Sequence, residues 1–246
     1  MTSRSLRLAG LALPTLLAVL SACRAPRATA DADTETMLDA AEPASPLRLR
    51  ATDADAWSRT QVDGRWVFEQ RPTDRYQPRY RSPLNLAILA DTSVHGDFDL
   101  EVDARQVGRE YPHRDLCLVF AMRDPDHFAY AHLATQGDDT AHHVHVVDAA
   151  PRRPITTWRS NGVAWGNTWH RLRLERRGAR VRVHFDDVVV LEAEPAPTAD
   201  GFVGIGSFDD EGQFANLRLR ADMLAHTQAS FFAPLADATV SGRPRS

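Results

Sequence analysis

The sequence predicts an all-β protein, a two-sheet antiparallel β-sandwich of the jelly-roll type. About eleven segments between residues 66 and 221 either alternate apolar and polar side chains or form short β-branched runs. Gly, Pro, Asp or Asn separates these segments, and none of them shows the apolar spacing of a helix. Strands of this number and length must pack as two sheets in order to bury one face of each.

Residues 1–23 are predicted to form a bacterial lipoprotein signal peptide. Arg4 and Arg7 precede the apolar stretch LAGLALPTLLAVL, which is too short and too interrupted by proline for a membrane span. The stretch ends in LSAC, which resembles a lipobox whose cysteine, Cys23, carries the lipid. An ordinary secretory signal with an incidental cysteine is the alternative. Arg24 follows in place of an aspartate, which favours anchoring in the outer membrane of a Gram-negative bacterium.

Changes in composition predict the domain boundaries. Residues 24–45 are rich in Ala, Pro, Thr and acidic residues and contain no aromatic residue, so we expect a flexible tether. Residues 46–221 form the sandwich domain. Residues 222–246 lose the alternation and are expected to form a loosely ordered C-terminal tail, with Phe231 and Phe232 as the side chains able to dock onto the domain.

The charge and the cysteine content exclude several kinds of site. The net charge of −4 gives no electrostatic reason to expect nucleic-acid binding. All 29 basic residues are arginine, which excludes a lysine nucleophile, a Schiff base and a P-loop lysine. If Cys23 carries lipid, Cys117 has no disulfide partner, and its apolar surroundings predict a buried, unreactive side chain.

The expected strands follow one another from residue 66 onward. In residues 98–105, Phe, Leu, Val and Ala alternate with Asp, Glu and Arg, which puts the apolar set on one face. Residues 172–174 and 181–185 repeat this pattern. The segments are WVFEQ, LNLAILA, FDLEVDARQV, DLCLVFAM, HFAYAHLA, HHVHVVD, ITTWRS, WHRLRLERRG, VRVHFDDVVVLEAE, FVGIGSF and FANLRLRA.

Residues 127–150, HFAYAHLATQGDDTAHHVHVVDAA, hold five of the chain's ten histidines. A hairpin that turns at TQGDD would place its Ala, Leu and Val side chains on the core face. Antiparallel pairing then sets Tyr130 near His145 and His132 near His143. The sequence therefore predicts one outward surface made of Phe128, Tyr130, His132, His143 and His145.

Two later segments carry a family resemblance. WHRLRLERRGARVRVHFDDVVV is a strand pair around a Gly turn, and GFVGIGSFDDEGQFANLRLR follows it. They resemble the C-terminal half of concanavalin A-like (laminin-G-like) lectin and glucanase sandwiches. EYPHRDLCLVF, DPDHFAYAHLA and GSFDDEGQF are similar to segments of uncharacterised bacterial secreted proteins related to the 3-keto-disaccharide hydrolase domain family. The resemblance spans about residues 47–221 and implies the sandwich fold, whose concave sheet often binds sugars.

Three interpretations of the histidine surface stay open. Aromatic rings stack on sugars while imidazoles bond their hydroxyls, which predicts a carbohydrate site. His132, His143 and His145 could instead converge on zinc. The third interpretation is a solvated polar face. Separately, Asp209 and Asp210 in GSFDDEG are weak candidates for a Ca²⁺ site, with a solvated turn as the alternative.

Further polar residues are expected around the histidine surface. Trp165, in the loop GVAWGN, is expected to be an exposed stacking platform. Arg152 is placed to bind acidic groups of a glycan. Arg114 and Asp115, in HRD, could bind a ligand or form a strand-end salt bridge.

Catalysis on a sugar requires two carboxyl groups about 5–10 Å apart. Sandwich glucanases carry E-x-D-x-x-E on one strand, whereas EVDARQ in this chain ends in the amide of Gln106. The Asn-Ser-Gly element of the keto-disaccharide hydrolases is also missing from HRDLCLVF. If the protein is an enzyme, His132 or His145 would be the general base and Tyr130 the acid. We expect a lipid-anchored envelope protein that binds carbohydrate; the alternatives are a glycan hydrolase or lyase and a structural envelope protein without a sugar ligand.

Overall fold

The computed structural model describes residues 35–36 and 48–235 of the chain. All of them belong to the second of the two units into which the chain divides, Ala32–Ser246. The predicted signal peptide, Cys23 and residues 24–34 and 37–45 of the predicted tether lie outside the described residues, while residues 35–36 of that tether form a short strand. In the described part of the chain, no helix is long and apolar enough to cross a membrane.

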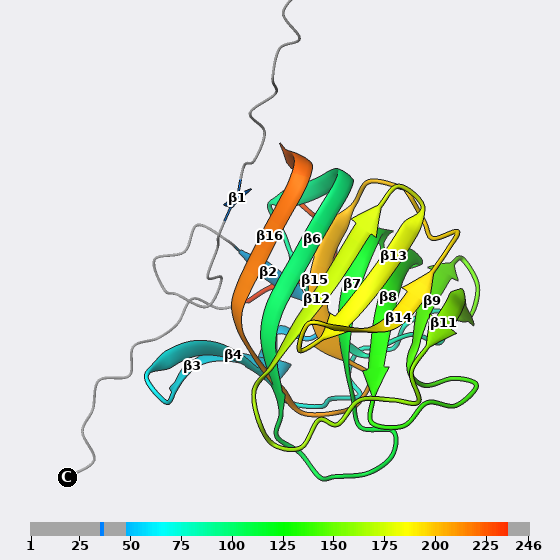
Figure 1. Ribbon diagram of the computed structural model, residues 1–246. Coiled ribbons are helices and arrows are strands. Elements are labelled where there is room, and N and C mark those ends of the chain that lie inside the picture. Colours follow the sequence, from blue (N-terminus) through cyan, green and yellow to red (C-terminus); the bar gives the residue numbers. More distant parts are fainter. Residues whose placement is uncertain (1–34, 37–47, 236–246) are drawn as a thin grey trace, which may run out of the picture. The chain divides into compact units, whose positions relative to one another are not determined.

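The prediction of an all-β, two-sheet sandwich is confirmed. The strands of the described residues form two antiparallel sheets, one in front of the other (Figure 1). Helix is limited, in the same residues, to the 3-10 turn η1 (Ala54–Ala56). Sheet A has the strand order β11-β14-β13-β12-β6-β16-β4-β3, with β1 also paired to β16. Sheet B has the order β10-β9-β8-β7-β15-β5-β2-β17.

The strands have the following bounds. Sheet A consists of β1 (Glu35–Thr36), β3 (Trp57–Val62), β4 (Arg65–Gln70), β6 (Thr92–Gln106), β11 (Thr156–Arg159), β12 (His170–Arg177), β13 (Arg180–Phe185), β14 (Val188–Ala193) and β16 (Gly212–His226). Sheet B consists of β2 (Leu49–Ala51), β5 (Asn85–Leu89), β7 (Asp115–Asp124), β8 (His127–Ala134), β9 (His143–Asp148), β10 (Arg153–Pro154), β15 (Phe202–Ser207) and β17 (Ala233–Pro234).

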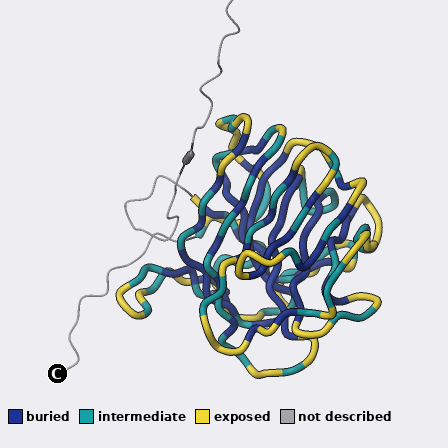
Figure 2. The backbone as a smooth tube through the Cα atoms, in the orientation of Figure 1, coloured by how far each residue is buried: buried dark blue, intermediate teal, exposed yellow. Residues whose placement is uncertain are grey.

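The main apolar core lies between the two sheets, as the alternation predicted. Strand interiors are buried and the connecting loops are exposed (Figure 2). In β6, Leu100 and Val102 point into this core, while Asp99 and Glu101 point away from it. Burying a side chain of this size contributes about 1.5–3 kcal/mol. The core also receives the predicted inward set of the hairpin, Ala129, Ala131, Leu133, Val144 and Val146.

Sheet B is buried on both of its faces. In β7 every residue from Asp115 to Met122 is buried. Leu118 and Phe120 pack in the core between the sheets, whereas Cys117 and Val119 belong to a second apolar cluster on the outer face of sheet B. Cys117 is fully buried, as expected. The side chains that pack over this outer face are Tyr80, Phe208, Phe231 and Phe232.

The C-terminal boundary differs from the prediction. β16 passes Ala221 and pairs with β6 as far as His226, and β17 pairs with β2. Arg50 Nε donates to the carbonyl oxygen of Phe231 at 2.8 Å. Residues 222–235 are thus part of the sandwich, because backbone pairing and the half-buried phenyl rings of Phe231 and Phe232 hold them there. The remainder of the predicted tail, residues 236–246, lies outside the described residues.

Candidate functional site

The predicted pairing of the histidine hairpin is confirmed. Tyr130 of β8 is the register partner of His145 of β9, and His132 is the partner of His143. These side chains lie on the outer face of sheet B, opposite the core face of the hairpin. The Tyr130 and His145 rings stack with centroids 5.1 Å apart and 16° between their planes.

The expectation that this face is open to a sugar is wrong. Phe128 and His132 are 4% exposed, His145 is 1% exposed, and Tyr130 has no exposed surface. Only His143 of the predicted surface is half-buried, and its Nδ1 and Nε2 bond the Thr156 hydroxyl and the Asp138 carbonyl oxygen. A sugar ring therefore cannot stack on these side chains in this structure.

Phe208 and Arg152 cover the rings of this face. Phe208 lies 5.4 Å from the His132 ring, centroid to centroid. Arg152, expected to bind a glycan, places its guanidinium 4.2 Å from the Phe208 centroid and donates to the Tyr130 hydroxyl at 3.2 Å. Phe231 and Phe232, from the segment after β16, pack against the same outer cluster, where Phe231 contacts Phe202 of β15.

The same burial removes the basis for the acid–base roles of the hairpin. Burial, and then the positive charge of Arg152, lower the pKa of His145 to about 2. Burial raises the pKa of Tyr130 above its ordinary value. Both side chains stay neutral at physiological pH and lie out of reach of solvent, so neither can exchange a proton with a sugar.

The structure does not gather the three histidines as a metal site. The His143 and His145 ring centroids are 5.6 Å apart, but both nitrogens of His143 are already hydrogen-bonded. Among the described residues, the only His, Cys, Asp and Glu side chains whose ligand atoms converge are Asp115, Asp209 and Asp210. This group includes both residues that the sequence suggested for Ca²⁺.

The acidic group lies at the edge of the closed face. Asp115 and Asp210 are buried, at 2% and 6% exposure, and Asp209 is exposed. Burial, and then the charge of Asp115, raise the pKa of Asp210 to about 7. The same two causes raise the pKa of Asp209. Asp115 precedes Asp210 by 95 positions, and no pattern in the sequence indicated that the two would meet.

Arg114 and Trp165 are structural side chains. Arg114 is 1% exposed, and its guanidinium donates to Gln106, Gly166 and Asn167 at 2.8–3.1 Å. The expectation of an exposed Trp165 is wrong: the ring is 1% exposed, and its Nε1 donates to the Leu133 carbonyl oxygen at 3.0 Å. Both residues border a cavity of about 540 Å³ at this end of the sandwich, but their polar groups are already bonded.

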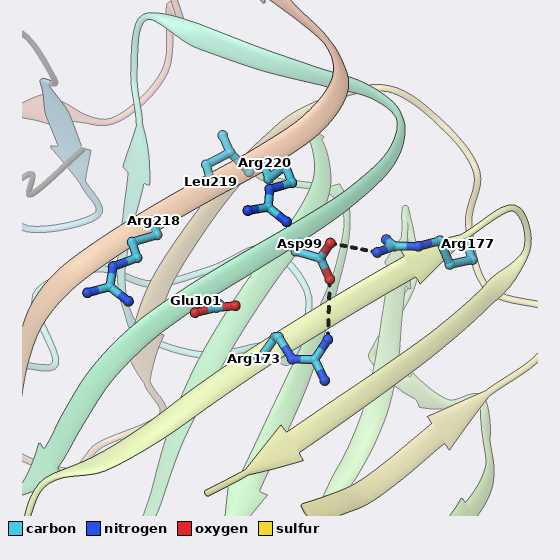
Figure 3. Close-up of a pocket in the computed structure, with 7 residues that line it drawn as sticks. All are labelled: Asp99, Glu101, Arg173, Arg177, Arg218, Leu219 and Arg220. Atoms are coloured by element: carbon cyan, nitrogen blue, oxygen red, sulfur yellow. Dashed lines mark hydrogen bonds and ion pairs between the residues drawn. The ribbon is translucent and has the colours of Figure 1, made fainter. Parts of the chain in front are cut away.

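A groove of about 270 Å³ crosses β16, β6 and β12 on the outer face of sheet A. The alternation in β6 predicted that its acidic side chains lie on this face, but we did not predict a site there. Figure 3 shows Glu101 between Arg218 of β16 and Arg173 of β12. Both arginines are register partners of Glu101 on the adjacent strands. The lining comprises Asp99, Glu101, Arg173, Arg177, Arg218, Leu219 and Arg220.

The charges of this groove are only partly satisfied by one another. Asp99 pairs with Arg173 and Arg177, at 3.5 and 2.6 Å. Within the described part of the chain, Glu101 and Arg218 make no hydrogen bond and no ion pair. Arginines outnumber carboxylates in the lining by four to two. The groove is thus a polar site with an excess of guanidinium groups.

The groove continues along the outward side chains of β6. Asp103 follows Glu101 on the same face and borders a further cavity of about 350 Å³. Trp169 lines that cavity, half-buried, with the guanidinium groups of Arg65 and Arg105 5.1 and 5.0 Å from its ring. An indole ring therefore lies on the same face of the sheet as the charged groove.

Known protein families and curated protein sequences give no match to this chain. Solved structures do match this chain. The carbohydrate-binding module CBM66 from Bacillus subtilis is 16% identical, with a TM-score of 0.52, over 70% of this chain and 95% of that one. A Bacillus subtilis protein with a galectin-like fold is 10% identical, with a TM-score of 0.45, over 71% of this chain and 89% of that one. The similarity to CBM66 shows a shared β-sandwich fold.

Proposed function

We propose that this protein binds carbohydrate that carries acidic groups, in the groove between Glu101 and Arg218 on sheet A. The observation that carries the proposal is this pair of side chains. They face each other on adjacent strands, and neither has a partner among the described residues. Charged groups left without partners in a groove are available to a ligand.

The lining suits an acidic sugar. A guanidinium group binds a carboxylate or sulfate through two parallel hydrogen bonds, and Arg173 and Arg218 flank the centre of the groove. The Glu101 carboxylate can accept hydrogen bonds from sugar hydroxyls. Trp169, farther along β6, offers an apolar ring edge to the next sugar unit.

The fold supports the same ligand class by analogy. CBM66, which shares the sandwich, is a carbohydrate-binding module. One fold hosts many functions, so the groove chemistry carries more weight than the likeness.

Binding of tri-galacturonate tests the proposal, with its methyl ester as the neutral counterpart. Isothermal titration with the full chain should show binding of the acid and at least about tenfold weaker binding of the ester, since a charge-assisted pair contributes about 1.5–3 kcal/mol. Arg218→Ala should weaken binding of the acid about tenfold or more. Glu101→Gln should weaken binding of both sugars.

The matched control is Arg153→Ala, which removes an exposed arginine from sheet B. It should leave the affinity unchanged. Equal affinity for acid and ester, or an Arg218→Ala variant that binds as well as wild type, contradicts the proposal. Mass analysis of the recovered sugar distinguishes the alternatives: shorter products indicate a hydrolase or lyase, and no binding to any glycan indicates a structural envelope protein.

We also propose that lipid on Cys23 holds the protein at the envelope, in the outer membrane. The lipobox-like sequence LSAC supports this. Cells fed labelled palmitate should label the wild-type protein, which should sediment with outer membranes. Cys23→Ala should abolish the label. A labelled Cys23→Ala protein, or an unlabelled wild type, contradicts the anchor.

A further inference from the structure

Three polar side chains outside the groove and the acidic group form a chain of contacts at the start of β6. Ser93 and His95 flank Val94, whose side chain packs in the core, so these two side chains point to the other face of sheet A. Oγ of Ser93 lies 3.1 Å from Nε2 of His95. Nδ1 of the same ring lies 2.7 Å from Oδ2 of Asp200, in the loop between β14 and β15. A hydroxyl, an imidazole and a carboxylate thus follow one another at hydrogen-bond distance.

The Asp200 carboxylate decides which ring nitrogen of His95 carries the proton. A carboxylate oxygen can only accept, so Nδ1 of the neutral ring donates to Asp200 and Nε2 keeps its lone pair. That lone pair faces the Ser93 hydroxyl, the only group among the described residues that hydrogen-bonds Nε2. The Thr227 hydroxyl, 3.2 Å from Oγ of Ser93, can act as donor or acceptor. The arrangement is that of a serine beside a general base that a third group orients.

Backbone hydrogen bonds hold the two chain segments of this group together. Val94, between the serine and the histidine, donates to the Gly201 carbonyl oxygen at 2.8 Å and accepts from the Gly201 N–H at 3.2 Å. The guanidinium group of buried Arg176 donates to the carbonyl oxygens of Gly96 and Ala199, at 2.9 and 3.0 Å. These bonds fix the strand that carries the serine and the histidine against the loop that carries the aspartate. The three side chains are therefore positioned before any ligand arrives.

A second group in the same sheet shows what distinguishes this one. Oγ1 of Thr168 lies 3.1 Å from Nε2 of His170, whose Nδ1 lies 2.7 Å from Oδ2 of Asp186. There, however, Nε2 also bonds the carbonyl oxygen of Trp165 at 2.7 Å. A carbonyl oxygen only accepts, so Nε2 of His170 carries a proton and cannot take another. Nε2 of His95 has no such acceptor beside it among the described residues, and it can act as a base.

We propose that Ser93, His95 and Asp200 form a catalytic site that transfers acyl groups from small esters to water. Nε2 of His95 takes the hydroxyl proton as Oγ of Ser93 attacks the carbonyl carbon of the ester. The bond from that carbon to the alcohol oxygen breaks, and the alcohol leaves with the proton from His95. Water then gives a proton to His95 and attacks the acyl-serine. The carboxylic acid leaves, and Oγ of Ser93 regains its proton from the ring.

The surroundings of the serine limit the size of the acyl group. Ser93 is 7% exposed, with the His95 ring and the Thr227 hydroxyl beside it. Asp200 and Thr227 are exposed, so the group lies at the surface of the sandwich. An acetyl group is small enough for so little exposed surface, whereas a long acyl chain would need an apolar groove. We therefore expect acetyl esters to be the substrates.

Acetylation by p-nitrophenyl acetate tests the site in the full chain. The wild type should release a burst of one p-nitrophenolate per chain, and peptide mass analysis after an acid quench should locate the acetyl group on Ser93. The chain has no lysine, so side-chain amines add no background. Ser93→Ala should lose the burst, and Ser93→Cys should restore it through a thioester. His95→Ala should slow the burst about 100-fold or more.

Asp200→Asn changes an exposed side chain, so the fold should persist, as circular dichroism would check. It should slow the burst about tenfold or more, and the ¹⁵N spectrum of the His95 ring should show less of the form protonated at Nδ1. The matched control is Ser160→Ala: this hydroxyl lies 3.0 Å from Nε2 of His142 but donates to the Gly162 carbonyl oxygen, so the burst should not change. A wild type without an acetyl group on Ser93, a burst that persists in Ser93→Ala, or an unchanged rate in His95→Ala would each overturn the site. These measurements use no sugar, so they stand apart from the glycan proposal.

Discussion

Tyr130 and His145 stack across the β8–β9 ladder, both rings are buried, and Phe208 packs against Tyr130 with 6.4 Å between the ring centroids. The pair thus contributes to the stability of an apolar layer on the outer face of sheet B. Stability measurements are the direct way to examine this layer.

Phe231→Ala should destabilise the domain by about 1–3 kcal/mol, less than a fully buried Phe→Ala change because Phe231 is half-buried. Its ring packs edge-on against Phe202 at 5.7 Å. Urea denaturation measures the loss. Trp158→Ala, at a residue 50% exposed, is the control and should have little effect. An unchanged midpoint in Phe231→Ala would show that the segment does not cover sheet B in solution.

Acidification should destabilise the protein through its buried histidines. Burial lowers the pKa of His142 to about 4 and that of His145 to about 2, from an ordinary value of 6.5. Below pH 6.5 these histidines bind protons in the unfolded chain but stay neutral in the folded protein. The stability present above pH 6.5 is therefore lost as the pH falls. The loss is at most about 1.4 kcal/mol per pH unit for each group.

Asp210 changes the stability of the fold in the opposite direction. Its pKa is raised to about 7, so the folded protein takes up this proton first, which adds stability as the pH falls from 7 toward 4. The pKa values of His143 and His184 are also lowered, so the histidines outweigh Asp210 and we expect a net loss of stability. Urea midpoints at pH 7.5 and 5.0 measure it, and His145→Phe should reduce the difference. Equal midpoints in the wild type would contradict neutral buried imidazoles.

Arg114→Lys should cost about 2–4 kcal/mol of stability, because an ammonium group cannot replace the planar fork that bonds Gln106, Gly166 and Asn167. Thermal unfolding would show it as a lowered Tm. Arg153→Lys, at an exposed position, is the matched control. If both variants have the Tm of the wild type, the hydrogen bonds of Arg114 contribute nothing to the stability of the fold.

Gly162→Ala should be far more damaging than Gly64→Ala. Gly162 has φ +125, and an added Cβ would lie 2.1 Å from the Thr135 carbonyl oxygen. Gly64 has φ +76 with open space around it, so alanine there should cost only about 1 kcal/mol. The comparison of the two Tm values checks the close approach of the loop that holds Gly162 to Thr135. Similar losses would contradict it.

The sequence predicted the class of fold and even the hairpin register, because alternation reports which side chains share a face. It could not report that another segment covers that face. One signal was present: LCLVFAM in β7 is apolar without alternation, which indicates a strand buried on both faces. That run, beside the hairpin, already argued against an open surface.

The acidic group and the groove could not be predicted from the sequence, because their residues come together only in the tertiary structure. Asp115 meets Asp210 only because β7 pairs with β15. Glu101 and Arg218 become neighbours only through the β6–β16 ladder. Trp165 looked like a loop residue, but its indole N–H finds a carbonyl group in β8 and the ring turns inward.

β2 and β17 are antiparallel partners at the edge of sheet B, and the backbone N–H of Leu235 donates to the carbonyl oxygen of Leu49 at 3.0 Å. A tensile load that pulls these two ends of the sandwich apart therefore acts on one hydrogen bond at a time, as in unzipping, and meets little mechanical resistance. The first segment to detach carries Phe231 and Phe232, so stretching would expose Phe202 on the outer face of sheet B before the rest of the sandwich unfolds.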